Sequence, residues 1–298
     1  MKILDGKNIA NDIFDEIKIE VSQLYTSKGQ KPHLVAILVG NNGASQTYGA
    51  SQTYVNAKVK ACEYVGFKST LIHLEDSISE YDLLSKINEI NKNNSIDGLI
   101  VQLPLPDHIS EKKVTESISP SKDVDGFHPE NLGKMVLNYP TFLPATPAGI
   151  LELLKRNNIS TSGKHCVVVG RSNIVGLPIS ILMGKNNKIG NCTVTITHSR
   201  TKNIKEITKS ADILIVALGK AEFISSDMIK KGVCIIDVGI TRVKSDFTKS
   251  GWKLLGDVNF DSVKDKCSYI TPVPGGVGPM TIAMLLKNTL KSFKLNVH

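Results

Sequence analysis

Residues 167–178 have the sequence VVVGRSNIVGLP, and this stretch decides the fold. Its valines predict a buried strand, and the glycine and serine that follow predict a turn leading into a helix. Free backbone N–H groups at such a turn point toward an anion. The glycine spacing differs from the common GxGxxG pattern, because Arg171 and Ser172 follow Gly170 and the next glycine is Gly176. The glycine spacing alone does not identify the ligand, so the residues around the turn must indicate which anion binds there.

Strand-like runs alternate with amphipathic helical stretches on both sides of this turn, which is typical of mostly parallel sheets with helical crossovers. The runs are residues 33–40, 69–74, 97–103, 164–170, 192–198, 211–218 and 232–239. A chain of 298 residues is long for one compact domain. We therefore predict an α/β fold of two α/β lobes with mostly parallel sheets and an active-site cleft between them. The C-terminal lobe is expected to be a Rossmann-like dinucleotide-binding domain.

The predicted lobes are joined by a connection rich in proline and glycine, roughly residues 118–147. The amphipathic stretch IAMLLKNTLKSF near the end of the chain predicts a helix that returns to the first lobe. We therefore predict a discontinuous catalytic domain, 1–146 plus 280–298, and a dinucleotide-binding domain, 147–279.

Composition excludes several classes of protein. Hydrophobic residues make up 41% and charged residues 21% of the chain, as in an ordinary globular protein. The first twenty residues lack the unbroken apolar core of a signal peptide, and no run of about 18 apolar residues predicts a membrane span. The five cysteines are scattered and never form a CxxC pair, which argues against disulfides and against a zinc site. We expect a cytoplasmic protein without a metal and without a membrane partner.

The formal net charge of +8 is spread along the chain without aromatic-basic clusters, so small anions are favoured over nucleic acid. The segment THSRT (197–201) ends the strand after the glycine turn, where an NAD enzyme commonly has an acidic residue for the ribose hydroxyls. It carries Ser199 and Arg200 instead, and Arg171 adds a second cation nearby. NADP is therefore favoured over NAD as the cofactor.

The hexapeptide GASQTY at 43–48 is repeated immediately in the first lobe. Six residues are too short for a repeat architecture, so we interpret the segment as a duplication absorbed by a loop. Lys58 follows four residues after Tyr54, whereas Gln52 stands at that distance from Tyr48, and only an i,i+4 pair shares a helical face. We predict that the first copy is extruded as a loop before the helix and that the second copy carries the chemistry.

The Tyr54 and Lys58 pair has two interpretations. Both residues can lie on a solvated helix face, which is common for an isolated YxxxK match. Alternatively, Lys58 carries protons and Tyr54 offers an aromatic face to a ligand. Short-chain dehydrogenases also use YxxxK, but their glycine-rich loop precedes the pair, whereas here it comes more than a hundred residues later. That order disfavours them.

The run DGLIVQLPLP (97–106) predicts a buried strand that ends at Gln102. Ligands bind outside the carboxyl ends of such strands, so the amide can orient a ligand or a lysine, although capping a loop explains it nearly as well. The segment KDVDGFHP (122–129) predicts a turn, where aspartates often bond their own backbone. A turn would direct either Asp123 or Asp125 into the cleft, where a carboxylate can accept hydrogen bonds from an amino-pyrimidine edge.

A paired-acid hydrolase is the rival interpretation of these two aspartates, and nothing else in the sequence supports it. His108 and His128 have no partner spacing that suggests a metal site or a triad, so we interpret them as ordinary loop histidines. The segment TPVPGGVGPMT (271–281) is different, because its prolines fix φ while its glycines allow close approach. That combination suits the wall of a binding cleft.

The order of the motifs along the chain resembles that of the methylenetetrahydrofolate dehydrogenase/cyclohydrolase family. The matching segments are ILDGK, ASQTYVNAKVKAC, DGLIVQLPLP, KDVDGFHP, TPAGI, GRSNIVGLP, DVGI, GDVNF and TPVPGGVGPMT, which together span residues 3 to about 290. The resemblance implies oxidation of 5,10-methylenetetrahydrofolate to the 5,10-methenyl form with NADP, followed by hydrolysis to 10-formyltetrahydrofolate. It also implies a homodimer. The extra hexapeptide departs from the family, where a single ASQTY is expected.

The resemblance also implies roles for individual residues. Lys58 matches the catalytic lysine, Gln102 the glutamine that holds it, Tyr54 the aromatic residue that stacks on the folate, and Asp125 the carboxylate that binds the pterin. The residues expected at the dinucleotide are Gly170, Arg171, Ser172, Ser199, Arg200 and Ile240. Pro274, Gly275 and Gly276 are expected to contact the folate. Two alternatives stay open: a monofunctional dehydrogenase of the same fold and a non-catalytic NADP-binding regulator.

Overall fold

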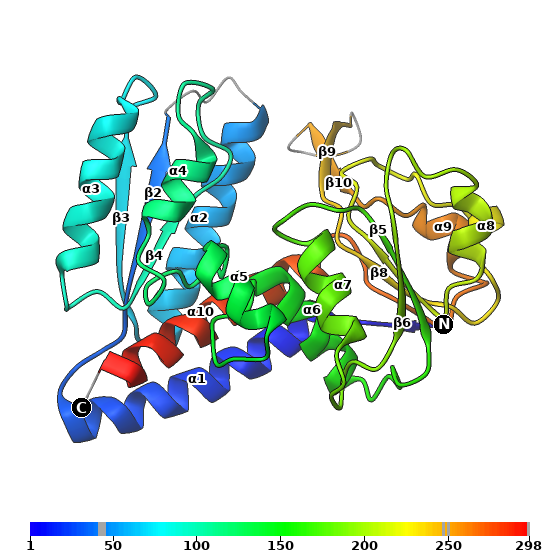
Figure 1. The fold of residues 1–298 in the computed structure, drawn as a ribbon, viewed down its shortest axis with the longest axis horizontal. Helices are drawn as coiled ribbons and strands as arrows, with labels where there is room; N and C mark the ends of the chain where they lie inside the picture. Colours follow the sequence, from blue (N-terminus) through cyan, green and yellow to red (C-terminus); the bar gives the residue numbers. More distant parts are fainter. Residues whose placement is uncertain (41–45, 246–247, 249–250, 297–298) are drawn as a thin grey trace. The chain divides into compact units, whose positions relative to one another are not determined.

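A computed structural model describes residues 1–40, 46–245, 248 and 251–296, with side chains except at 27–28, 46–51 and 53. The chain forms two compact units (Figure 1). Unit 1 comprises Met1–Ala10 and Thr146–Thr281, and unit 2 comprises Asn11–Ala145 and Ile282–His298. Each unit contains a parallel sheet with helices, so the predicted α/β fold class is confirmed.

Unit 1 contains a six-stranded sheet in the order β1-β11-β8-β7-β5-β6, in which every pairing is parallel. Its strands are β1 (Lys2–Ile3), β5 (His165–Val169), β6 (Thr193–Thr197), β7 (Ile213–Val216), β8 (Cys234–Asp237) and β11 (Tyr269–Ile270). An antiparallel pair, β9 (Thr241–Lys244) and β10 (Trp252–Leu255), lies outside this sheet. The helices are α6 (Ala145–Arg156), which begins at the unit boundary, α7 (Gly176–Gly184), α8 (Ile204–Lys209), the 3-10 turn Ser226–Met228 and α9 (Phe260–Val263).

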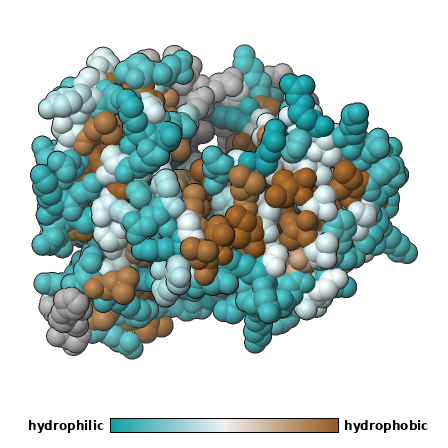
Figure 2. Space-filling model, viewed as in Figure 1, coloured by the Kyte–Doolittle hydropathy of each residue, from teal (hydrophilic) through white to brown (hydrophobic). Residues whose placement is uncertain are grey.

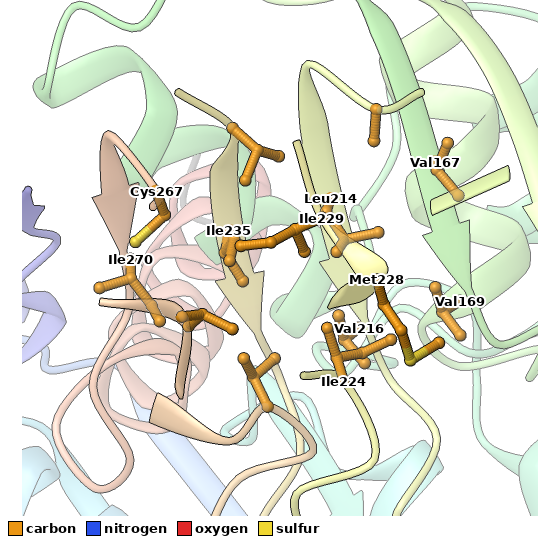
Figure 3. Close-up of a cluster of buried hydrophobic side chains, with 14 residues drawn as sticks. Val167, Val169, Leu214, Val216, Ile224, Met228, Ile229, Ile235, Cys267 and Ile270 are labelled. Atoms are coloured by element: carbon orange, nitrogen blue, oxygen red, sulfur yellow. The ribbon is translucent and has the colours of Figure 1, made fainter. Parts of the chain in front are cut away.

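The core of unit 1 forms on strands that are apolar on both faces. Figure 3 shows Val167 and Val169 of β5 in one cluster with Leu214 and Val216 of β7 and with Ile235 of β8. All five are fully buried. Burial on both faces explains why these runs read as continuous apolar segments rather than alternating ones.

Residues 1–10 lie in unit 1, whereas the sequence analysis grouped them with the first lobe. The reason is β1, which pairs in parallel with β11 and adds a strand to the edge of the sheet. The backbone N–H of Lys7 also donates to the carbonyl of Gly275, at 2.9 Å. A two-residue strand carries no periodicity signal in a sequence, so this pairing could not be predicted.

Unit 2 contains a three-stranded parallel sheet in the order β3-β2-β4. The strands are β2 (His33–Val39), β3 (Lys68–Leu74) and β4 (Gly98–Val101), and the helices are α2 (Gln46–Val65), α3 (Glu80–Lys92), α4 (Glu111–Ser117) and α5 (Pro129–Val136). Every residue of β2, the central strand, is buried. The boundary between the units falls within α1 (Gly6–Lys28) and α10 (Val277–Asn296).

Helix α10 packs in unit 2 from Ile282 onward. The side-chain amide of Asn288 donates to the carbonyls of Val124 (2.8 Å) and Leu143 (3.0 Å). Lys294 forms an ion pair with Glu20 of α1. The described helices include none that is long and apolar enough to cross a membrane, and the face shown in Figure 2 is mainly hydrophilic.

The structure corrects the prediction for the duplicated hexapeptide. Helix α2 begins at Gln46, so the second half of the first copy is helical rather than extruded. The first half, 43–45, lies outside the described residues. Residues added at the N-terminal end of a helix do not rotate the positions that follow, so extrusion is not needed to keep the register of Tyr54 and Lys58.

Candidate active site

Lys58 occupies an apolar position on the inner face of α2. The buried residues Val55, Lys58, Cys62 and Val65 recur at spacings of three and four, which places them on one helical face. Lys58 is only 7% exposed. Burying an ammonium group among apolar residues costs free energy unless a polar partner meets it. The ammonium group of Lys58 therefore needs a polar partner inside unit 2.

The partner of Lys58 is Gln102, the pairing that the family resemblance implied. Lys58 Nζ donates to Gln102 Oε1 at 3.2 Å. Gln102 is fixed in turn, because its Nε2 donates to the carbonyl of Leu103 (2.8 Å) and its backbone N–H donates to that of Ile37 (2.9 Å). The amide oxygen is thus held toward Lys58 at the carboxyl end of β4.

The turn KDVDGFHP separates its two aspartates, and Asp123 takes the structural role. Oδ1 of Asp123 accepts N–H groups from Gly126 and Phe127, and Oδ2 accepts from His128 N and Asn131 Nδ2, at 2.8–3.2 Å. The same segment runs beside β4, where Leu99 bridges Asp123. Asp125, two residues later, is therefore close to the end of β4.

Asp125 is half-buried, and no hydrogen bond to its carboxylate is found among the described residues. Burial raises the pKa of Asp125, the charge of Lys58 opposes that rise, and Asp123 adds to it. Lys58 and Asp125 both lie near the carboxyl end of β4, because Lys58 bonds Gln102, which follows that strand, and the segment of Asp125 runs beside it. Burial also raises the pKa of Tyr54, so its hydroxyl stays protonated at neutral pH and its ring is an uncharged surface. Unit 2 thus brings Lys58, Gln102 and Asp125 to the carboxyl end of β4, and Tyr54 lies one helical turn before Lys58 on α2.

The glycine turn of unit 1 lies between β5 and α7. The N–H of Gly170 donates to the carbonyl of Thr197 at 2.9 Å. Gly170 has φ +129, and a Cβ atom there would lie 2.3 Å from the carbonyl oxygen of Ala217. Only glycine fits this place, which leaves the backbone open to close approach by a ligand.

Ser172 shapes the beginning of α7. Its Oγ accepts the N–H groups of Val175 and Gly176, both at 3.2 Å. Arg171 is exposed beside it, and Arg200 is exposed at the end of the neighbouring strand β6. Two cations beside a bare glycine turn at the carboxyl ends of parallel strands fit a phosphorylated dinucleotide.

The remaining predicted residues also lie in unit 1. Ser199 is exposed after β6, and Ile240 follows β8 with 39% exposure. Pro274, Gly275 and Gly276 lie in the loop between β11 and α10, where Gly275 accepts the hydrogen bond from Lys7. The predicted dinucleotide residues thus all follow the carboxyl ends of β5, β6 and β8. The loop that was predicted to contact the folate belongs to the same unit.

Comparison with known proteins gives two family matches in succession along the chain. The family model "Tetrahydrofolate dehydrogenase/cyclohydrolase, catalytic domain" matches residues 4–125, and that for the NAD(P)-binding domain matches residues 144–297. The chain belongs to the tetrahydrofolate dehydrogenase/cyclohydrolase family. The bifunctional protein FolD of Cytophaga hutchinsonii is 62% identical over 295 residues, which cover 99% of this chain and 100% of that protein.

Solved structures of the family have the same fold. The bifunctional enzyme FolD, a methylenetetrahydrofolate dehydrogenase/cyclohydrolase from Campylobacter jejuni, is 48% identical with a TM-score of 0.91 over 100% of both chains. The Trypanosoma brucei FolD, solved as a complex with NADP cofactor and an inhibitor, is 36% identical with a TM-score of 0.92, covering 99% of this chain and 98% of that one. The resemblance inferred from the motifs is therefore confirmed.

Several residues that shape the site were not predicted. Reasoning from the turn left open whether Asp123 or Asp125 enters the cleft. Asn131, whose side-chain amide donates to Oδ2 of Asp123, was not considered. His128 caps α5 by accepting the N–H of Glu130 on its Nδ1 at 3.1 Å, a role consistent with an ordinary loop histidine. Asp237 lies two residues before Gly239 in DVGI and Asp257 directly follows Gly256 in GDVNF, and these nearby glycines were the one signal available for them.

Asp125→Asn is expected to weaken folate binding. A hydrogen bond to a charged group contributes about 1.5–3 kcal/mol, so KM for the folate should rise roughly 10- to 100-fold. In the unmodified protein, KM should also rise as the pH falls toward the raised pKa of Asp125, because protonation removes the charged acceptor. Steady-state assays with Asp107→Asn as the control, an exposed carboxylate of the same unit, measure both effects. An unchanged KM in Asp125→Asn would contradict the role.

Proposed function

We propose that this chain oxidises 5,10-methylenetetrahydrofolate to the 5,10-methenyl form with NADP and hydrolyses that form to 10-formyltetrahydrofolate, in one-carbon metabolism. The observation that carries the proposal is the buried Lys58, hydrogen-bonded to Gln102 and within the electrostatic influence of Asp125. Relatives named as bifunctional FolD proteins at 54–62% identity support both activities. Unit 2 supplies the catalytic residues and unit 1 the dinucleotide site.

Hydrolysis requires proton movement at two places. Water adds to the cationic methenyl carbon and loses one proton, which leaves a hydroxyl group on that carbon. The bond from this carbon to the departing nitrogen then breaks, the nitrogen gains a proton, and the hydroxyl group loses its proton as the formyl C=O forms. Lys58 Nζ carries protons between these places. Gln102 holds Nζ in position, which limits the conformational search that a free lysine side chain would make.

Folate orientation uses both a ring and a carboxylate. Tyr54 stacks its uncharged ring on the folate, and Asp125 accepts hydrogen bonds from the amino-pyrimidine edge of the pterin. These two contacts orient the carbon that reacts in both steps. Pro274, Gly275 and Gly276 stay a prediction as folate contacts, because they belong to unit 1.

Bound NADP supplies the hydride acceptor. The bare backbone at Gly170, the turn that follows it and the exposed cation of Arg171 hold its phosphates, and Ser172, Ser199 and Ile240 border it. No side-chain acid is required for hydride transfer, because the residues of the site contribute chiefly by orientation.

The proposal is tested by following reduced-nicotinamide absorbance with purified protein, methylenetetrahydrofolate and either NADP or NAD, and separately the decay of methenyltetrahydrofolate. We expect turnover in both assays and preference for NADP. Turnover only in the first would favour the monofunctional dehydrogenase. Binding of NADP without turnover in either would favour the non-catalytic regulator.

Arg200→Ala is expected to reduce the preference for NADP. The exposed guanidinium follows β6, where the adenosine ribose of a dinucleotide lies, so its loss removes a charged contact to the 2′-phosphate. We expect KM for NADP to rise roughly tenfold, as for a charged hydrogen bond, with KM for NAD unchanged. Lys202→Ala removes an exposed cation two residues away and serves as the control. Equal effects on NADP and NAD would contradict the assignment.

We also propose that the chain acts in the cytoplasm as a homodimer. The five cysteines are free and buried, which suits a reducing compartment. Light scattering coupled to gel filtration measures the oligomeric state, and a mass near 32.4 kDa would identify a monomer and contradict the dimer.

A further inference from the structure

Two buried aspartates lie at the carboxyl end of the unit 1 sheet. Asp237 is the last residue of β8 and is 3% exposed, and Asp257 follows β10 and is fully buried. In the described part of the chain, the hydrogen bonds found to both carboxylates come from backbone N–H groups. The two aspartates therefore hold segments of the main chain in place by accepting hydrogen bonds from their N–H groups.

Asp257 holds the segment that follows β7. Its Oδ2 accepts the N–H groups of Leu218 (2.6 Å) and Gly219 (2.9 Å). Its Oδ1 is buried with no hydrogen-bond partner among the described residues. An unpartnered carboxylate oxygen costs free energy of folding, so packing alone does not account for an aspartate here.

Asp237 holds the segments on either side of the β9–β10 hairpin. Oδ1 accepts the N–H groups of Gly239 and Asp257, both at 3.0 Å, and Oδ2 accepts that of Val258 at 2.9 Å. Burial raises the pKa of Asp237 to about 7, and the charge of Asp257 adds to the rise, while the backbone hydrogen bonds oppose it. The two carboxyl groups are thus close enough to interact.

Glycine is required where the backbone packs on these carboxyl groups. A Cβ atom at Gly239 would lie 2.2 Å from Cγ of Asp257, and one at Gly256 would lie 1.9 Å from Oδ2 of Asp237. Neither distance is sterically possible. The segments after β8 and β10 therefore pack on the two carboxyl groups too closely for any side chain at Gly239 or Gly256.

The sheet order shows which half of the dinucleotide these segments face. Strand β5, which carries the glycine turn, lies between β6 and β7, so the strand order reverses at β5 and the phosphates lie there. The adenosine ribose lies toward the end of β6. The other half of the ligand must then extend over the ends of β7 and β8, where Leu218 and Gly239 lie.

We propose that Asp237 and Asp257 are positioning residues that shape the backbone wall for the nicotinamide half of NADP. The inference rests on the proposed function, in which unit 1 binds NADP. Neither aspartate is required to touch the ligand. Each holds main-chain segments whose N–H and C=O groups border the nicotinamide.

Binding of NADP and of adenosine 2′,5′-bisphosphate, which has only the adenosine half, tests the proposal by calorimetry. Asp257→Ala should raise Kd for NADP at least ~10-fold, the effect of one lost interaction of about 1.4 kcal/mol, and leave Kd for the bisphosphate within about twofold. Asp257→Asn should restore most of the NADP affinity, because its amide oxygen accepts the same two N–H groups. Asp212→Ala is the matched control, since Asp212 also accepts a backbone N–H, from His165, but at the amino end of the sheet.

The outcomes separate the inference from the proposed function. Equal weakening of both ligands in Asp257→Ala, or equal effects of Asp257→Ala and Asp212→Ala on NADP, would show a merely structural role and overturn the inference. If the unmodified protein binds neither ligand, the proposed function fails instead. If Asp257→Ala does not fold, Gly239→Ala replaces it, because its Cβ displaces the Asp257 carboxylate, and the same selective loss of NADP affinity is expected.

Discussion

Lys58→Met is expected to reduce hydrolysis of methenyltetrahydrofolate by roughly 100- to 10,000-fold, the range that a positioned proton carrier contributes. The side chain of methionine has a length similar to that of lysine and is apolar, and residue 58 lies on the buried stripe of α2 with Val55 and Cys62. Folding should therefore be preserved, because the substitution removes a buried charge and keeps the volume. Dehydrogenase activity should fall much less, since hydride transfer needs no side-chain acid.

The control for this prediction is Lys60→Met, which removes a lysine from the exposed face of the same helix. It should leave both activities unchanged. The decay of methenyltetrahydrofolate measures hydrolysis, and reduced-nicotinamide absorbance measures oxidation. Hydrolysis within threefold of the unmodified protein in Lys58→Met would show that the proton carrier is another group.

The sequence predicted the elements that carry strong patterns. The seven strand-like runs became the strands β2–β8. Strands β2, β4, β5, β7 and β8 are buried and need continuous apolar segments, whereas β3 and β6 are partly exposed strands at the edges of their sheets. The i,i+4 relation predicted that Tyr54 and Lys58 share a helical face, and the run 97–103 predicted that Gln102 ends a strand. The grouping of Lys58, Gln102 and Asp125 was implied by the resemblance to the family and not by local periodicity.

Features that depend on tertiary hydrogen bonds could not be predicted. The short β1 strand joins the sheet of unit 1 through pairing with β11, which lies more than 260 residues away in the chain. The choice between Asp123 and Asp125 depended on which carboxylate meets the N–H groups of the turn. The start of α2 at Gln46 was missed because a helix can lengthen at its free end without disturbing the positions that follow.

Gly170→Ala is expected to abolish NADP binding at ordinary concentrations. The substitution forces a side chain into φ +129 and places Cβ 2.3 Å from the carbonyl oxygen of Ala217. Backbone strain and overpacking each cost about 1–3 kcal/mol, so Kd for NADP should rise at least ~100-fold as the turn moves away from its binding shape. Hydrolysis of methenyltetrahydrofolate should fall far less, because Lys58 and Gln102 lie in unit 2.

Gly163→Ala separates this effect from strain alone. Gly163 also has a positive φ, +73, but no atom lies within 4 Å of the position that its Cβ would take. Gly163 precedes β5, whereas Gly170 follows that strand. The Gly163→Ala control should therefore lose a little stability and keep its affinity for NADP. Denaturant unfolding followed by the fluorescence of Trp252, the single tryptophan and a residue of unit 1, shows whether each variant is folded. A folded Gly170→Ala protein with Kd for NADP within threefold of the unmodified protein would mean that the turn between β5 and α7 does not hold the dinucleotide.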